Sequence, residues 1–348
     1  YINTVESDLN TAQAARKLGF KPLLTPVGDK WILHKIAGLI AETSIRSFKR
    51  RTGKPLPPAV RKKWETVRKK GASDVYPLRD LENYFKQSAV QGKKDSKDYL
   101  AIFHNFPFSV GSEETGHNIT TGWVDKEDGE RIPVFCGNGL KSALNTFTAT
   151  ENLFQQKTVR AYYSSLKNPF KAGCKKTLSG YYIRQELFSK NSSVWNKVKK
   201  TVLQNGKSLG FKTRTMSFHE DPDMLYISLE KGRGPERAAF FIRNSGTENK
   251  IGINLRGDRK HARNLKIIGD QCIRILLSAM KDETEHFYKL ELDVLSQIAF
   301  NTLPEKDLII EKPSRPRILN EMIKQELIEQ TPKGYCLTPL GKWYINHQ

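Results

Sequence analysis

The sequence predicts an α/β domain with a parallel-type sheet, followed by an α+β domain and a small α+β tail. Strand-like and helix-like runs alternate over residues 1–43, which is typical of strand–helix–strand units with parallel strands. Two consecutive strand-like runs then precede a long amphipathic run at 259–280, the order of an α+β unit. The apolar pattern changes again near residue 284. We therefore expect three domains, at 1–150, 151–283 and 284–348.

The first domain is predicted to begin with a strand at 1–5 and a helix from about 9 to 18. A second strand at 21–25 leads through a turn to a helix from about 30 to 41. Asp29 precedes this helix and is a residue type that caps helix N-termini. The strand predicted at 99–103 resumes the sheet.

Residues 45–100 are predicted to be an insertion, helical around 59–70 and 78–87. Between Ile45 and Lys70 there are eleven Lys/Arg and one acid, a net +10 of the chain's +21. Such density suits a polyanion, and an equally good interpretation is a solvated helical face beside a linker. The cations proposed for nucleic-acid contact are Arg50, Arg51, Arg61, Lys62 and Lys63, with Trp64 among them.

Composition predicts a soluble, cytoplasmic protein. Of the 348 residues 38% are hydrophobic, and no run approaches the ~18 apolar residues of a membrane span. The four cysteines are far apart, so we expect free thiols. Because Tyr1 falls in a strand already under way, we expect the chain to be the C-terminal part of a longer protein.

The stretch Arg243–Glu248 (RNSGTE) is suited to hold a phosphate, because it joins strand-like runs at 238–242 and 251–255. A guanidinium can bind two phosphate oxygens, and glycine lets the main chain come close. Backbone N–H groups in such a turn can form an anion-binding nest. Without further context, a simple polar hairpin explains the stretch equally well.

This stretch resembles the phosphate-binding loop of phosphohexomutases, which carry Arg-x-Ser-Gly-Thr-Glu in their C-terminal domain. Residues 25–30 (TPVGDK) are similar to the Thr-x-Val-Gly-Asp-Arg segment of that family's third domain. Residues 112–117 (SEETGH) are similar to its Gly-Glu-x-Ser-Gly-His sugar-binding loop. Three motifs in family order indicate a phosphohexomutase-like chain over most of residues 1–283.

The resemblance implies an isomerase of carbohydrate metabolism, which interconverts hexose 1- and 6-phosphates through a phosphoserine and a bisphosphate intermediate. It implies that Glu113 and Thr115 bind sugar hydroxyls, that His117 lies near the sugar, and that Lys30 faces the transferred phosphate. The residues implied for the phosphate that is not transferred are Arg243, Asn244, Ser245, Gly246 and Thr247.

Several positions depart from the family pattern. Lys30 replaces an arginine and loses its planar fork, Thr115 replaces a serine, and Gly252 stands where an arginine is usual. The sequence contains neither a Thr-Ala-Ser-His-like serine loop nor an Asp-Gly-Asp-x-Asp-Arg metal loop. We therefore expect no catalytic residue and no metal ligand in this chain, and the Mg²⁺ of the complete enzyme to be bound elsewhere.

The tail is predicted to form two helices, a hairpin at 327–337 and a short closing helix. This order resembles a winged-helix domain, a class that binds nucleic acid or protein. The alternative function is therefore an inactive, mutase-derived protein that binds nucleic acid or a protein partner through its insertion and tail. Candidate tail contacts are Arg315, Arg317 and Lys324.

Overall fold

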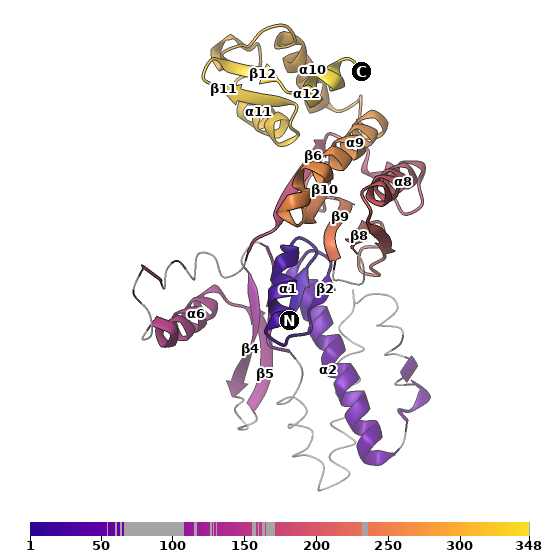
Figure 1. The fold of residues 1–348 in the computed structure, drawn as a ribbon, viewed down its shortest axis with the longest axis vertical. Coiled ribbons are helices and arrows are strands. Elements are labelled where there is room, and N and C mark those ends of the chain that lie inside the picture. The colour runs from indigo at the N-terminus through magenta and orange to yellow at the C-terminus, as the bar shows by residue number, and fades with distance from the viewer. Residues whose placement is uncertain are drawn as a thin grey trace. The chain divides into compact units, whose positions relative to one another are not determined.

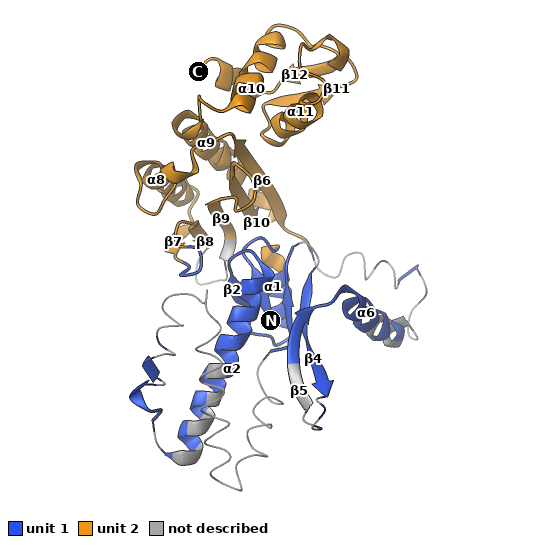
Figure 2. Cartoon of the chain, turned by 180° about the vertical axis from the view of Figure 1, so that it is seen from behind, with its two compact units in different colours: residues 1–7, 11–171, 218–221 blue, residues 8–10, 172–217, 222–348 orange. Residues whose placement is uncertain are grey.

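Figure 1 shows the fold in a computed structural model of the chain. The chain divides into two compact units (Figure 2), unit 1 with residues 1–7, 11–171 and 218–221, and unit 2 with residues 8–10, 172–217 and 222–348. The residues that the structure describes are 1–53, 55–59, 61–62, 65, 108–114, 117–125, 127, 129, 131–154, 158, 160–161, 164, 171–231 and 236–347.

Unit 1 contains a five-stranded mixed sheet in the order β2-β1-β3-β4-β5. The strand β1 is parallel to β2 and β3, with Ile2 opposite Leu23 and Gly111, whereas β3, β4 and β5 are antiparallel to one another. From residue 1 to 154 the elements are β1 (Ile2–Thr4), α1 (Leu9–Lys17), β2 (Leu23–Thr25), α2 (Asp29–Thr52), β3 (Val110–Ser112), β4 (Asn118–Asp125), β5 (Arg131–Gly137) and α6 (Gly139–Phe154).

The helix α2 packs closely against β3. Ile32 and Ile36 of α2 are buried with Ile2 and Ile119 of the sheet. A Cβ at Gly111 would lie 2.4 Å from Cγ2 of Ile32, so this position requires glycine. The apolar face predicted for residues 30–41 therefore covers the parallel strands.

Three predictions for unit 1 need correction. The sheet is not purely parallel, because the unpredicted hairpin β4–β5 extends it. The helix predicted to end near residue 41 continues to Thr52, since no breaker occurs before Gly53, which has a φ of 66°. Asp29 is not the cap: Gly28 occupies the N-cap and Asp29 is the first helical residue.

Most of the predicted insertion lies outside the described residues, including the helix at 78–87 and the strand at 99–103. Within the predicted helix at 59–70, the described residues 59, 61–62 and 65 are helical.

Unit 2 begins with a five-stranded antiparallel sheet in the order β6-β10-β9-β8-β7. Buried leucine and isoleucine side chains of β8 and β10 pack with the apolar stripes of α8 and α9, the second of which was predicted from its helical spacing. The elements are β6 (Cys174–Tyr181), η1 (Gln185–Leu187), α8 (Ser193–Ser208), β7 (Lys212–Met216), β8 (Leu225–Glu230), β9 (Glu236–Asn244), β10 (Lys250–Gly257), η2 (Arg259–His261) and α9 (Ala262–Met280).

The tail shows the predicted order of two helices, a hairpin and a closing helix. Its buried side chains belong to the same apolar core as α9, with Met280 and Tyr288 packed in one cluster with Leu319 and Tyr344. The elements are α10 (His286–Gln297), η3 (Glu305–Asp307), α11 (Arg315–Lys324), β11 (Ile328–Thr331), β12 (Gly334–Leu337) and α12 (Pro339–Ile345).

None of the helices in the described part of the chain combines the length and the apolar composition that a membrane crossing needs. The four cysteines are free thiols.

Candidate sugar-phosphate-binding loops

The candidate phosphate loop is the tip of the β9–β10 hairpin. The strand β9 ends at Asn244, which lies opposite Ile251 of β10. The Ser245 amide donates to the Lys250 carbonyl at 2.9 Å, and the Lys250 amide donates to the Glu248 carbonyl at 2.8 Å. These bonds close a tight turn in which the predicted phosphate-binding residues are consecutive.

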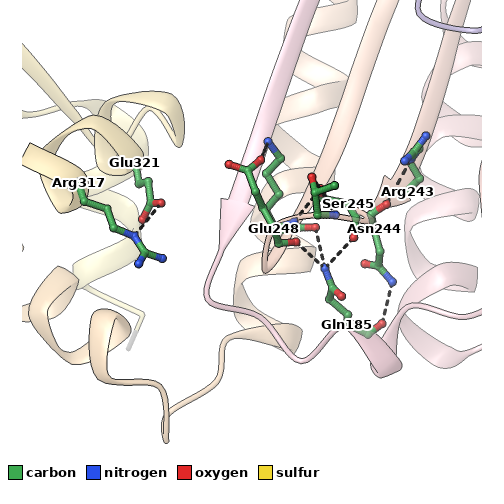
Figure 3. Close-up of polar contacts among 9 residues, drawn as sticks. Gln185, Arg243, Asn244, Ser245, Glu248, Arg317 and Glu321 are labelled. Atoms are coloured by element: carbon green, nitrogen blue, oxygen red, sulfur yellow. Dashed lines mark hydrogen bonds and ion pairs between the residues drawn. The ribbon is translucent and has the colours of Figure 1, made fainter. Parts of the chain in front are cut away.

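Gln185 of η1 supports the turn from one side (Figure 3). Its Nε2 lies 3.3, 3.0 and 3.2 Å from the carbonyl oxygens of Ser245, Glu248 and Lys250, respectively. Asn244 in turn donates its Nδ2 to the Gln185 carbonyl at 2.9 Å. Because the supporting bonds use the carbonyls of the loop, its amides can face the other way.

Two amides of the loop point at one oxygen. The N–H groups of Thr247 and Glu248 both lie 3.3 Å from Oγ of Ser245. Gly246, which directly precedes Thr247, has no positive φ, and a Cβ there would meet no heavy atom within 4 Å. Neither the backbone conformation nor the packing requires glycine at this position. The effect of the missing side chain is to leave the amides of Thr247 and Glu248 open to approach.

The charges of the loop are separated. Figure 3 shows Arg243 and Glu248 on opposite sides of the turn. Arg243 is half-buried, and its Nε donates to the Asn244 carbonyl at 3.2 Å. Glu248 forms an ion pair with Lys250, and the hydrogen bond from Lys250 lowers the pKa of Glu248. The acid of the motif is therefore neutralised within the loop.

The candidate sugar loop in unit 1 joins β3 to β4. The Glu113 amide donates to the His117 carbonyl at 3.0 Å, and Nδ1 of His117 lies 3.2 Å from Oδ2 of Asp29. Ligand atoms of Asp29, Glu113 and His117 all lie within 4.8 Å of one another. The fold thus brings together the two motifs of unit 1, which are far apart in the sequence.

Sequence reasoning missed the role of Asp29, which was predicted to be a helix cap. Oδ1 of Asp29 is buried and has no hydrogen-bond partner within the described part of the chain. Lys30 is exposed, and its Nζ lies 4.8 Å from the ring centroid of Trp31. Thr115 lies outside the described residues.

The group of Asp29, Glu113 and His117 does not fit the Mg²⁺ that the resemblance implies. Mg²⁺ prefers an octahedral shell of oxygen ligands, whereas this group offers two carboxylates and an imidazole.

The candidate nucleic-acid contacts of unit 1 lie in α2 and in the predicted insertion. Arg50, Arg61 and Lys62 are exposed, and Arg61 forms an ion pair with Glu65 at 2.9 Å. Arg51 lies in α2, and Lys63 and Trp64 lie outside the described residues.

In the tail, basic side chains contact the protein itself. Arg315 donates to the carbonyls of Leu308 and Ile310 at 3.1 Å each. Arg317 donates to Glu321 at 3.3 Å, and its guanidinium lies 4.0 Å from the ring centroid of Phe287. Lys324 is exposed at the end of α11. These contacts give no support to nucleic-acid binding by α11.

Comparisons with known proteins add little. No family model and no curated protein matches the chain. It is similar to two solved structures of N-acetylglucosamine-phosphate mutase, described as a member of the alpha-D-phosphohexomutase superfamily, one in the product complex and one in the substrate complex. Sequence identity is 11% in both, with TM-scores of 0.33 and 0.32, too low to carry an argument about function. The matches cover 79% of this chain and 38% of those chains, so the chain spans well under half of their length.

Proposed function

We propose that this chain is the part of a phosphohexomutase-like protein that binds the sugar hydroxyls and the non-transferred phosphate of a hexose phosphate. The convergence of the Thr247 and Glu248 amides on one oxygen position carries the proposal. Support comes from the three motifs and from the way Gln185 holds the carbonyls of the turn.

In this proposal, a phosphate oxygen takes the position that Oγ of Ser245 now occupies between the two amides. The Ser245 and Thr247 hydroxyls and the Arg243 guanidinium donate to the remaining oxygens, the guanidinium to two of them at once. The loop forms no covalent bond with the phosphate. It fixes one end of the substrate, and such positioning supplies much of the rate in phosphoryl transfer.

On the sugar side, Glu113 would accept hydrogen bonds from two adjacent hydroxyls, since a carboxylate offers two acceptor oxygens. His117 is oriented by Asp29 and would contact the sugar from the same loop. Lys30 would add positive charge near the phosphate being transferred.

The transfer itself needs groups outside this sequence. The phosphoserine and the Mg²⁺-binding loop of the family have no counterpart in these residues. When bound in a complete enzyme, Mg²⁺ would neutralise the charge that develops on the transferred phosphoryl group. Interconversion of hexose 1- and 6-phosphates is therefore proposed for the whole protein, and this chain is proposed to bind substrate only.

We also propose the three-domain division and a winged-helix-like class for the tail. Besides its helices and hairpin, the tail has an isolated bridge between Leu303 and Tyr335, which places a further extended segment beside β12. In this arrangement α11 is the helix before the hairpin.

Calorimetric titration with a hexose 6-phosphate tests the phosphate site. Arg243→Ala should weaken binding at least about tenfold, because a hydrogen bond to a charged group contributes about 1.5–3 kcal/mol. Arg243→Lys should recover only part of the affinity, since lysine lacks the planar fork. Arg214→Ala, on the exposed side of β7, is the matched control. Equal binding by Arg243→Ala and the parent chain would exclude the phosphate site.

A further inference from the structure

A buried polar network joins the tail to the end of α9. Nζ of Lys281, directly after α9, lies 2.5 Å from Oε1 of Glu291 and 3.1 Å from Oε1 of Gln325. Gln325 donates its own Nε2 to the other carboxylate oxygen of Glu291. The side chains of Lys281 and Glu291 are 3% and 0% exposed. The side chains of Lys281, Glu291 and Gln325 thus form hydrogen bonds to one another in a site that is shielded from water.

Three tyrosine rings surround the same ammonium group. The ring centroids of Tyr182, Tyr288 and Tyr344 lie 5.5, 5.4 and 5.2 Å from Nζ of Lys281. Burial lowers the pKa of Lys281, and the carboxylate of Glu291 opposes this shift. A buried pair of this kind adds little net stability, but breaking it is costly, so it favours one arrangement of the tail.

The segment Tyr181–Ile183 contacts the tail from the sheet side. The Tyr181 amide donates to Oε1 of Gln325 at 3.0 Å, and the Tyr182 hydroxyl donates to the carboxylate of Glu321 on α11. Burial, together with the hydrogen bond to Glu321, raises the pKa of the Tyr182 hydroxyl, so the hydroxyl stays protonated and keeps donating.

The same segment also holds the phosphate loop. The Tyr182 amide donates to the carbonyl of Asn249 at 3.0 Å, and the Ile183 amide donates to its side-chain Oδ1 at 3.1 Å. Asn249 is the last residue before β10. The three consecutive residues Tyr181–Ile183 therefore form hydrogen bonds both to the tail and to the end of the phosphate loop.

The backbone of Tyr182 shows that the segment is fixed by its surroundings. Its φ is 56°, in the left-handed region, which costs a non-glycine residue roughly 1–3 kcal/mol. Such a conformation persists only when neighbouring contacts determine it. Here those contacts are the bonds to Glu321 and Asn249 and the stacking of the ring on Phe287, at 5.9 Å between centroids.

We propose that the tail is a positioning element for the phosphate loop, acting through Tyr181–Ile183. By fixing Asn249, it keeps the turn closed and the Thr247 and Glu248 amides convergent. The role in ligand affinity rests on the phosphate site proposed above, whereas the ordering of the loop can be measured without any ligand.

The test uses the full chain and two tyrosine-to-phenylalanine variants. Tyr182→Phe removes the bond to Glu321 and keeps the ring. Tyr335→Phe removes a tail bond of the same kind, from the Tyr335 hydroxyl to Glu305 at 3.4 Å, which does not involve the segment. Hydrogen exchange of the amides at 245–248 is measured first, followed by titration with inorganic phosphate.

Tyr182→Phe should speed exchange at 245–248 and weaken phosphate binding by about two- to thirtyfold, the range over which mutations between two sites change their coupling. Tyr335→Phe should change neither after correction for global stability. Glu321→Gln, which keeps an acceptor for the Tyr182 hydroxyl, should resemble the parent, and Glu321→Ala should resemble Tyr182→Phe.

The outcomes separate the two proposals. Exchange and phosphate affinity that are the same in Tyr182→Phe as in the parent would overturn the positioning role. If the parent chain binds no phosphate but the amides at 245–248 exchange faster in Tyr182→Phe than in the parent, the link from tail to loop is upheld. Only the phosphate site is then overturned.

Discussion

The phosphate loop of unit 2 and the sugar loop of unit 1 are held in different ways. Gln185 contacts three carbonyls of the first, and Asn249 ties its end to a buried segment. In the described part of the second, the Glu113 amide closes the loop, and the pair of exposed His117 and half-buried Asp29 orients it. A turn whose backbone amides are already in place loses little conformational entropy on binding a ligand. Exposed side chains lose more when they become ordered, and this loss reduces the affinity. Under the proposed function, the phosphate loop should therefore supply most of the affinity, and the sugar loop should supply the selectivity.

The largest effect is expected from removing the buried ammonium group of Lys281 in unit 2. Lys281→Met leaves the carboxylate of Glu291 buried without its ion-pair partner, and should lower the free energy of unfolding by about 3–5 kcal/mol. Phosphate affinity should fall with it. Chemical denaturation followed by near-ultraviolet circular dichroism measures the loss.

The double variant Lys281→Met/Glu291→Leu is the control, because it removes both charges and should recover part of the stability. A single variant as stable as the parent would show that the pair does not support unit 2.

The second prediction concerns Gln185, which supports the turn without touching the ligand. Gln185→Ala removes the donor that the three carbonyls share, although those of Glu248 and Lys250 keep their backbone donors. The change should cost about 0.5–1.5 kcal/mol of stability, with weaker phosphate binding. Gln297→Ala is the matched control, since Gln297 likewise holds a loop, at the backbone of Ile309. If Gln185→Ala binds phosphate as tightly as Gln297→Ala, the claim that Gln185 holds the β9–β10 turn ready for phosphate is contradicted.

The sequence could predict the β9–β10 hairpin and its turn, but not the contacts that support the turn. The motif 243–248 is local, and the flanking strands alternate clearly, so β9, β10 and the turn follow from neighbouring residues. Gln185 binds backbone carbonyls about sixty positions away, and such contacts leave no pattern in the loop. For the same reason the Asp29–His117 pair, formed by residues on different elements, was missed.

In the fold, too, some elements could be predicted from the sequence and others could not. The long stripe of α9 and the order of tail elements could be predicted, because periodicity and turn residues mark them. The hairpin β4–β5 and the last turns of α2 could not. Those of their side chains whose burial the structure describes are largely exposed or half-buried, so burial imposes little pattern on the sequence.

The third prediction is a pH dependence in unit 2. Partial burial would raise the pKa of Glu326, but the hydrogen bonds from Lys176 and Lys266 outweigh it and hold the pKa below its ordinary value of 4.5. As pH falls through 4.5, the unfolded chain takes up the proton first, so the free energy of unfolding should decrease until the folded pKa is passed. Glu326→Gln should be less stable at pH 7, and its stability should vary less over this acidic range. Parallel pH curves for the two chains would contradict the role of Glu326.

The smallest expected effect on stability lies in the sugar loop. Asp29→Asn weakens an exposed pair, with 66% of His117 and 35% of Asp29 exposed, and should change stability by less than about 1 kcal/mol. Affinity for a hexose phosphate should fall a few-fold while affinity for inorganic phosphate is unchanged. Glu42→Gln, in the exposed Glu42–Arg46 pair of α2, is the control. A large loss of stability would show that the sugar loop is as firmly built as the phosphate loop.

The central claim is that the β9–β10 turn binds phosphate through its amides. The most direct measurement is a titration of ¹⁵N-labelled chain with inorganic phosphate, followed by the amide resonances of Gly246, Thr247 and Glu248. The account predicts that these three resonances shift together and saturate with one dissociation constant. Saturable shifts confined to the basic residues of α2, with the loop resonances unmoved, would contradict it.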